Sequence, residues 1–227
     1  MNQPVDQSVG GLVRFRADFG YDGTDFLGWA KQPGKRTVEA ELVRALELIF
    51  GEDASNPTNP FGLTVAGRTD AGVHALHQVA HFDLSPAQLK RLGRNSDIAH
   101  KLNGLLPGDI RVNSVEAAPV GFDARFSAIH RRYRYRIADS ASEHSPLETR
   151  FTLEVAGNLD VNAMQTAAAS LIGLHDFASF CKPREGSTTI RELREVTVTR
   201  APAERNSVVE IELEADAFCH NMVRSIV

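Results

Sequence analysis

Residues 13–21, V-R-F-R-A-D-F-G-Y, alternate hydrophobic and polar side chains almost without interruption. This period of two is typical of a β-strand with one buried face. Asp22-Gly23 then turns the chain. After a loop, Thr37 can cap a helix that Gly51 ends. The hydrophobic stripe of that helix comprises Val38, Leu42, Ala45, Leu46 and Ile49. The stretch therefore predicts a β-α unit.

Strands and helices continue to alternate along the chain. The patterns predict strands at 63–66, 78–84, 110–115, 133–137, 196–198 and 209–217, a helical region between 85 and 107, and a helix from Asp160 to Gly173. This order predicts an α+β fold with two α/β halves and largely antiparallel sheets. We expect a disordered tail over 1–10, an N-terminal half over 11–122 and a C-terminal half over 123–227.

The chain end also carries an expectation. Met222, Val223 and Ile226 begin a hydrophobic helical stripe, in a helix that we expect to start at about Phe218. No cap or stop signal follows before Val227. We therefore expect the C-terminal half to be incomplete.

Composition excludes several classes of protein. The 227 residues contain no apolar run of the roughly 18 residues that a membrane span needs, so we expect no membrane association. Cys181 and Cys219 lack the spacing of a metal site and predict reduced thiols in a cytoplasmic protein.

Charge is unevenly distributed along the sequence. The formal net charge is −4, yet residues 125–136 hold five arginines and two tyrosines without an acid. Acids gather elsewhere, notably in V-E-I-E-L-E-A-D at 209–216. This predicts a basic face separate from an acidic one.

The basic segment has the composition that unstacked RNA bases require. In a strand, Tyr133 and Tyr135 share one face, and the opposite face carries arginines. Aromatic rings can stack on bases while guanidinium groups hold phosphates. One of the two tyrosines is assigned to the core, and phosphate contacts are expected among Arg131, Arg132, Arg134 and Arg136.

A second stretch, A-G-R-T-D-A-G-V-H-A at 66–75, places Asp70 in a loop between glycines. Gly67 and Gly72 permit positive φ or a close approach to a ligand. On local grounds Asp70 is most simply a turn residue that bonds its own backbone. It could also be a nucleophile, because Arg68, two residues away, can keep the carboxylate ionised.

Other kinds of site find weaker support. His74, His77 and His81 would share a face only in a helix, and the alternation that begins at Gln78 removes His81 from such a metal site. A glycosidase needs a second carboxylate paired with Asp70, and no spacing nominates one. Nor do serine or cysteine nucleophile motifs occur.

Several segments together resemble the tRNA pseudouridine synthase A family. They are Y-D-G-T-D-F-L-G-W (21–29), A-G-R-T-D-A-G-V-H (66–74), L-P-G-D-I (106–110), A-R-F-S-A (124–128), R-R-Y-R-Y (131–135) and F-C-H-N-M-V-R (218–224). They cover nearly the whole chain in the family's order. The combination of the aspartate loop, the arginine-tyrosine strand and the final H-x-M-V-R is very specific.

The resemblance implies an isomerase that converts uridines 38, 39 and 40 of the tRNA anticodon stem-loop to pseudouridine. It implies no cofactor and no metal, with Asp70 as the covalent catalyst. By the same resemblance, Tyr133 stacks on the target base, Arg68 helps to displace and replace the flipped nucleotide, and Arg224 pairs with the catalytic carboxylate. It also implies a homodimer, with an RNA-binding cleft between two ferredoxin-like halves.

Two alternatives from other classes stay open. One is a non-catalytic RNA-binding module, in which Asp70 is only a turn residue. The other is a hydrolase in which Asp70 works with an unrecognised acid on a small glycoside. If the chain is a synthase, the residues leave open whether Asp70 attacks ribose C1′, leads to proton removal from C2′, or attacks uracil C6.

Overall fold

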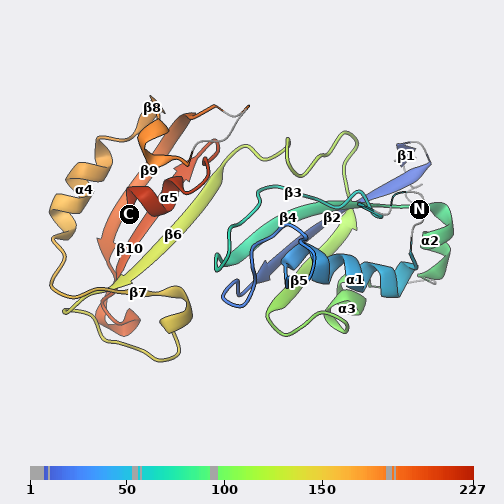
Figure 1. Cartoon of the computed structure of the whole chain (residues 1–227), viewed down its shortest axis with the longest axis horizontal. Helices are drawn as coiled ribbons and strands as arrows, with labels where there is room; N and C mark the ends of the chain where they lie inside the picture. Colours follow the sequence, from blue (N-terminus) through green and yellow to red (C-terminus); the bar gives the residue numbers. More distant parts are fainter. Residues whose placement is uncertain are drawn as a thin grey trace, which may run out of the picture. The chain divides into compact units, whose positions relative to one another are not determined.

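The chain folds into two compact α+β units, Met1–Ala128 and Ile129–Val227. They are seen in a computed structural model that describes residues 8–9, 11–52, 56, 58–92, 97–182, 186 and 188–227. Each unit is built on a sheet with helices beside it (Figure 1). The predicted fold class, α+β with largely antiparallel sheets, is therefore confirmed.

The first unit has the strand order of a ferredoxin-like fold. Its elements are β1 (Ser8–Val9), β2 (Leu12–Tyr21), α1 (Val38–Phe50), β3 (Thr64–Val65), β4 (Ala75–Leu84), α2 (Pro86–Arg91), α3 (Ile98–Asn103) and β5 (Ile110–Ala117). β2 lies between β5 and β4, and β3 forms the far edge beside β4, with every pairing antiparallel. This arrangement is the β-α-β-β-α-β pattern, in which the two central strands, β2 and β4, are the first and third of the four strands β2 to β5.

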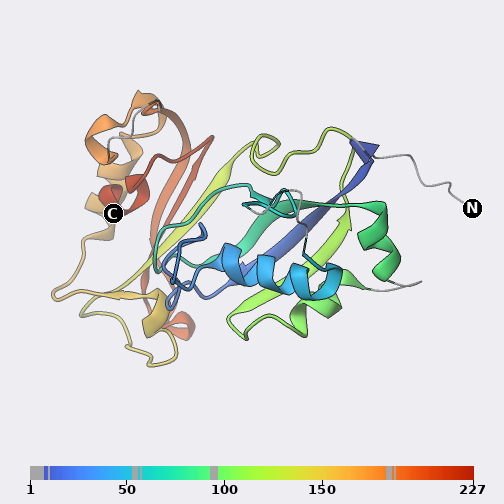
Figure 2. The same ribbon diagram turned by 45° about the vertical axis from the view of Figure 1, so that its right-hand side comes forward.

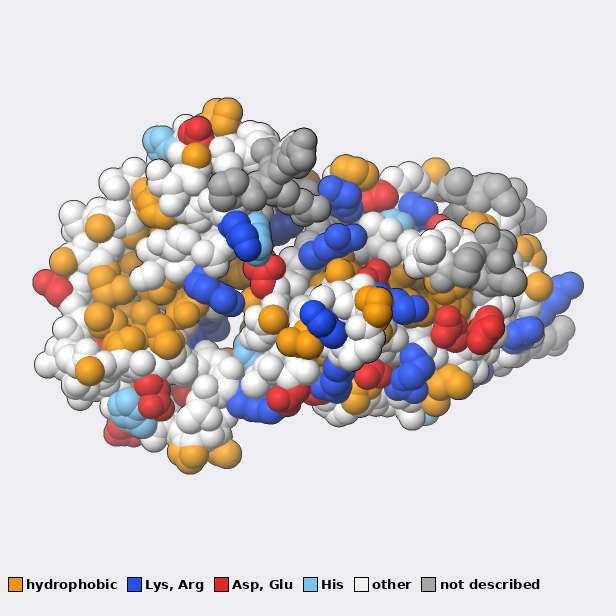
Figure 3. Space-filling view, viewed as in Figure 1, with side chains coloured by type: hydrophobic (Ala, Val, Ile, Leu, Met, Phe, Trp, Pro, Cys, Tyr) orange, Lys and Arg blue, Asp and Glu red, His pale blue; other side chains and the backbone are white. Residues whose placement is uncertain are grey.

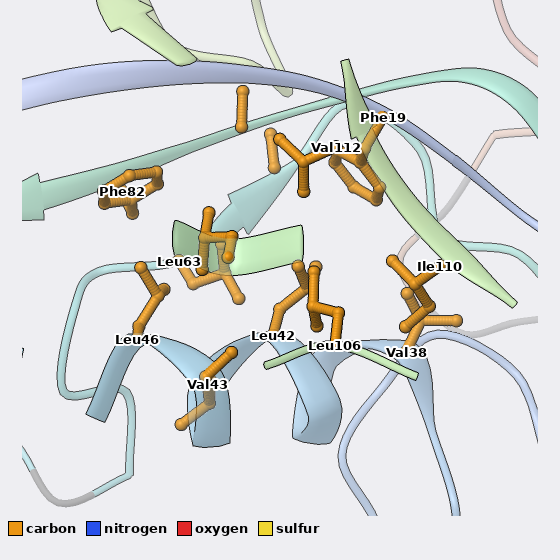
Figure 4. Close-up of a cluster of buried hydrophobic side chains, with 14 of the residues drawn as sticks. Phe19, Val38, Leu42, Val43, Leu46, Leu63, Phe82, Leu106, Ile110 and Val112 are labelled. Carbon is orange, nitrogen blue, oxygen red and sulfur yellow. The ribbon is translucent and has the colours of Figure 1, made fainter. Parts of the chain in front are cut away.

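The hydrophobic pattern of β2 and α1 builds the core of this unit. Figure 4 shows Val38, Leu42 and Leu46 projecting from α1 toward the sheet, where Phe19 and Phe82 lie. The helix runs along the sheet in Figure 2. Its predicted stripe is confirmed, since four of its five residues are buried and Ile49 packs against them.

Thr37 occupies the predicted N-cap position but does not cap through its side chain. Its hydroxyl oxygen is buried without a hydrogen-bond partner in the described part of the chain. Gly51 ends the helix as predicted, with a φ of +79° that favours glycine.

The second unit is also built from strands and helices. Its elements are β6 (Arg131–Ala138), β7 (Leu153–Glu154), α4 (Val161–Ala169), β8 (Gly173–Asp176), β9 (Ile190–Arg200), β10 (Val209–Ala215) and α5 (Met222–Ile226), with short 3₁₀ turns at Thr149–Phe151, Ala178–Phe180 and Ala203–Arg205. The strand order is β7-β6-β10-β9-β8, and only β7 pairs in parallel among the described strands. α4 packs on β9, and its Asp160 side chain accepts the N-cap hydrogen bond from the Ala163 N–H.

Several predicted boundaries differ from the structure. The helix expected from Asp160 to Gly173 spans Val161–Ala169, and Gly173 begins β8. The helical region between 85 and 107 contains two short helices, α2 and α3. The last helix begins at Met222 rather than Phe218, because Asn221 adopts a left-handed φ of +71°. Of the predicted tail, residues 1–7 and 10 lie outside the described residues, whereas Ser8–Val9 pair with the start of β2.

The prediction of two reduced cysteines is wrong for this structure. Cys181 and Cys219 form a disulfide across 5.7 Å between their Cα atoms. The pairing depends on tertiary contacts that bring the segment after Phe180 beside the segment before α5. A neighbouring backbone hydrogen bond, from the Lys182 N–H to the His220 carbonyl oxygen (3.0 Å), joins the same two segments.

The surfaces of the two units differ in character. Figure 3 shows a broad hydrophobic area over the second unit, whereas basic and acidic side chains intermingle over the first. No residue of α4 is buried, although Met164 and Ala168 pack against the second core. On the face seen in Figure 3, the second unit thus exposes a broad apolar area to solvent.

Candidate active site

The loop between β3 and β4 presents two of the predicted site residues. Asp70 and Arg68 are both exposed there. Gly72 has a φ of +76°, which confirms the positive φ expected at that glycine, whereas Gly67 does not share it. The Val73 N–H donates to the Asp70 carbonyl oxygen (3.2 Å), so a backbone turn closes directly after the aspartate. This geometry holds two charged side chains at the tip of a tight loop.

Backbone hydrogen bonds to the segment 21–29 hold this loop on both sides of Asp70. On one side, the Trp29 N–H donates to the Thr69 carbonyl oxygen (3.0 Å). On the other, the Gly72 N–H donates to the Phe26 carbonyl oxygen (3.3 Å). The backbone on both sides of Asp70 is therefore held in place by these hydrogen bonds.

Close backbone packing explains two glycines of the Y-D-G-T-D-F-L-G-W segment. Gly28 has a φ of +93°, and a Cβ there would lie 3.0 Å from the Thr69 carbonyl oxygen. At Gly23 a Cβ would come within 2.0 Å of the Val73 carbonyl oxygen. Only glycine allows the segment to approach the Asp70 loop this closely.

Polar side chains complete the support beneath the loop. Hydroxyl oxygens of Tyr21 and Thr69 share a hydrogen bond of 2.7 Å. The Gln78 side-chain amide donates to the Gly67 carbonyl oxygen (2.9 Å) and to the Tyr21 hydroxyl (3.4 Å). Burial raises the pKa of Tyr21, so its hydroxyl stays neutral and keeps its proton for hydrogen bonding.

A bidentate ion pair supports the segment 21–29 from its other side. The Arg36 guanidinium donates to both carboxylate oxygens of Asp109 at 2.8 and 2.9 Å, and it lies 4.0 Å from the ring centroid of Phe26. Backbone N–H groups of Asp22 and Leu27 bond to the Asp109 and Arg36 carbonyl oxygens, each at 2.9 Å. Asp109 belongs to the L-P-G-D-I motif, for which the sequence suggested no role.

The three histidines have separate surroundings. His74 accepts the Gly23 N–H at Nδ1 (3.1 Å). His81 is buried in β4 and accepts the Ala124 N–H at Nδ1 (2.9 Å), and burial lowers its pKa. His77 is exposed. Among the described residues, no group of histidine, cysteine or carboxylate side chains has the arrangement of a metal site.

The arginine face of β6 is neutralised within its own sheet. β10, which carries the acidic segment 209–216, is its antiparallel neighbour, and glutamates lie directly opposite arginines in the register. The ion pairs are Arg132 with Glu214 (2.7 Å), Arg134 with Glu212 (2.6 Å), and Arg136 with Glu148 (3.0 Å) and Glu210 (3.7 Å). The predicted separation of a basic face from an acidic one is therefore wrong for these strands.

The two tyrosines of β6 have different neighbours. Tyr135 packs against the second core. Tyr133, half-buried on the same face, meets Phe218 edge to face with ring centroids 5.0 Å apart. An aromatic pair of this kind orients a ring without covering both of its faces.

Arg224 lies on the short helix α5 of the second unit. Met222 is fully buried and anchors this helix in the second core, and Arg224 itself is exposed. The disulfide between Cys181 and Cys219 fixes the chain just before the helix. Thus Asp70 and Arg68 belong to the first unit, and Tyr133 and Arg224 to the second.

This arrangement suits nucleophilic chemistry on a large substrate. An exposed carboxylate on a rigid loop can reach a substrate atom without rearrangement of the backbone. The exposed Arg68 guanidinium, two residues away, can bind phosphate. Sequence reasoning identified the loop but missed its supports; the glycine-rich motif and the L-P-G-D-I motif were the available signals.

Comparison with known proteins agrees with this geometry. The model of the family described as "tRNA pseudouridine synthase" matches residues 17–127 and 167–227. The matched regions include the Asp70 loop, the segment that holds it and the helix that carries Arg224.

Curated relatives extend the similarity over nearly the whole chain. The chain is 49% identical over 227 residues to tRNA pseudouridine synthase A of Leifsonia xyli, covering 95% of this chain and 76% of the relative. It is 50% identical over 217 residues to the protein of the same name from Frankia casuarinae, covering 96% and 74%. A third relative of that name, from Bifidobacterium longum, is 43% identical over 240 residues, covering 95% and 79%. The chain therefore belongs to the tRNA pseudouridine synthase family.

Proposed function

We propose that this protein isomerises uridines 38, 39 and 40 of the tRNA anticodon stem-loop to pseudouridine, with Asp70 as the nucleophile. The observation that carries the proposal is the rigid loop that presents Asp70 beside Arg68, held by backbone hydrogen bonds on both sides. Family membership supports the same reaction class.

The reaction explains why the site needs a carboxylate and aromatic and cationic groups. The glycosidic bond between N1 and ribose C1′ breaks, the uracil turns, and C5 bonds to C1′ while the C5 proton is lost and N1 gains a proton. Substrate and product are isomers, so the balance requires no oxidant or reductant. One nucleophile can hold the sugar or the base between the two bond changes.

Access to the target base accounts for the remaining roles. A stacked uridine must leave the helix before C1′ or C6 can be attacked, and flipping costs a few kcal/mol. We assign Arg68 to the gap that the flipped nucleotide leaves, and Tyr133 to stacking on the base. Arg224 is assigned to pairing with the Asp70 carboxylate.

Tritium release from tRNA labelled at uridine C5 tests the proposal. Formation of the C5–C1′ bond frees the tritium, so release that maps to positions 38–40 is expected. Binding without release would favour the non-catalytic RNA-binding module. Cleavage of a small glycoside without tritium release would favour the hydrolase.

We further infer a homodimer in the cytoplasm. The dimer is supported by exposed hydrophobic side chains in one segment of the second unit, at Leu147, Phe151 and Leu153. Light scattering coupled to size exclusion should give twice the monomer mass. Localisation rests on the proposed tRNA substrate; separately, none of the described helices is long and apolar enough to cross a membrane.

A further inference from the structure

A groove of about 750 Å³ opens beside the Asp70 loop in the first unit. Its walls come from the loop before α1, the first turns of α1 and residues 58–60. Arg68 lines the groove from the Asp70 loop itself. Because two residues of extended chain span at most about 7 Å, the groove begins next to the proposed nucleophile.

Cations outnumber anions among the charged side chains that line this groove. Lys31, Lys35 and Arg68 are all exposed there. Within the described part of the chain, none of the three forms an ion pair, in contrast to the arginines of β6. Glu39 also lines the groove, but its carboxylate accepts the Lys31 backbone N–H at 2.6 Å. The groove thus offers three positive charges against one engaged carboxylate.

A defined turn presents one of these lysines. Pro33 and Gly34 occupy its central positions, Gly34 has a φ of +67°, and the Lys35 N–H donates to the Gln32 carbonyl oxygen (3.2 Å). This is the pattern of a type II turn. The Lys35 ammonium also donates to the Gln32 side chain (3.1 Å). A Cβ at Gly34 would meet nothing within 4 Å, so the turn leaves open space around its backbone.

We propose that this groove binds the sugar-phosphate backbone of the tRNA strand next to the uridine that Asp70 attacks. The inference rests on the proposed function. Compact ammonium groups on a preformed turn suit phosphates, and phosphate contacts fix the register of a nucleic acid without reading its sequence. The groove would therefore position the anticodon stem-loop while Arg68 acts at the flipped nucleotide.

The test compares single lysine substitutions in binding of an anticodon stem-loop RNA at several salt concentrations. Lys31→Gln and Lys35→Gln should each weaken binding and reduce the slope of log affinity against log salt by about 1, because one phosphate contact is lost. Lys35→Arg should restore most of the slope. Lys90→Gln, which removes an exposed lysine on α2 outside the groove, is the matched control and should leave the slope unchanged.

Binding and tritium release are measured on the same proteins, so the two proposals can fail separately. If Lys31→Gln and Lys35→Gln bind like the Lys90→Gln control while the unmodified protein still isomerises tRNA, the groove proposal is overturned and the proposed function stands. If the lysines control the salt slope but the unmodified protein releases no tritium, the RNA groove is supported and the proposed function is not.

Discussion

Replacement of Gly28 by alanine tests whether the segment 21–29 holds Asp70 in place. The added Cβ would lie 3.0 Å from the Thr69 carbonyl oxygen and 3.4 Å from the Asp70 carbonyl carbon. The first of these distances is shorter than ordinary contact, so the loop must move by about 0.4 Å to accommodate it. Alanine must also adopt the φ of +93°, which costs about 1–2 kcal/mol.

These distances give an expected size for the effect on turnover. Misplacement of a catalytic group by 1 Å can cost about a hundredfold, so a shift of about 0.4 Å predicts a loss of roughly sixfold or more. tRNA affinity should change little, because no cation is removed. Single-turnover tritium release measures the chemical step. The fluorescence of Trp29, the only tryptophan, follows unfolding from a buried position beside the loop.

Gly121→Ala provides the matched control. Gly121 has a similar φ of +78°, but a Cβ there would meet nothing within 4 Å. Both variants should lose about 1–2 kcal/mol of stability, whereas only Gly28→Ala should lose turnover per folded molecule. Equal turnover of the two variants would refute the claim that close packing of this segment positions Asp70.

Three further predictions concern other parts of the two units. Tyr133→Leu should lose about 1–3 kcal/mol of stacking energy and so isomerise tRNA more slowly in single-turnover assays, whereas Tyr133→Phe should keep a nearly normal rate. Equal rates for the leucine variant and the unmodified protein would leave the ring with a purely structural role. Arg36→Lys keeps the charge but loses the bidentate pair with Asp109, so kcat should fall with little change in KM, and a change in KM alone would contradict this. Arg200 and backbone N–H groups hold the pKa of Asp139 below its usual range, so this carboxylate stabilises the second unit above about pH 4 and less as the pH falls further. Asp139→Asn should therefore lower the free energy of unfolding by about 1–3 kcal/mol at neutral pH. In urea titrations at several pH values, the stability of the variant should fall less steeply with acid than that of the unmodified protein. Parallel pH profiles of the two proteins would contradict the assignment.

Features encoded by local periodicity could be predicted from the sequence. The alternation of 13–21 predicted β2, and the stripe between Thr37 and Gly51 predicted α1, because each pattern directly reflects which side chains face the core. The aspartate loop was also recognisable, since glycines and the neighbouring strands mark it. Its chemistry, however, came from the resemblance and not from the loop pattern.

Features that depend on pairing between distant segments could not be predicted. Nothing near Arg134 indicates that Glu212, from a strand far along the chain, would lie opposite it. The disulfide joins cysteines 38 residues apart, and that spacing alone suggests no partner. The ion pair between Arg36 and Asp109 likewise forms only once β5 pairs with β2. Strand pairing thus turned a suspected basic face into a neutral one and gave the motif around Asp109 a supporting role.

The catalytic role of Asp70 is tested most directly by Asp70→Asn in single-turnover tritium release from tRNA labelled at uridine C5. Asparagine preserves the size of the side chain and leaves the backbone hydrogen bonds that hold the loop, but it removes the carboxylate that we propose as the nucleophile. We predict unchanged folding, retained tRNA binding and no measurable release. Retention of even a tenth of the normal rate by a variant verified by intact mass would contradict the assignment of Asp70 as the nucleophile.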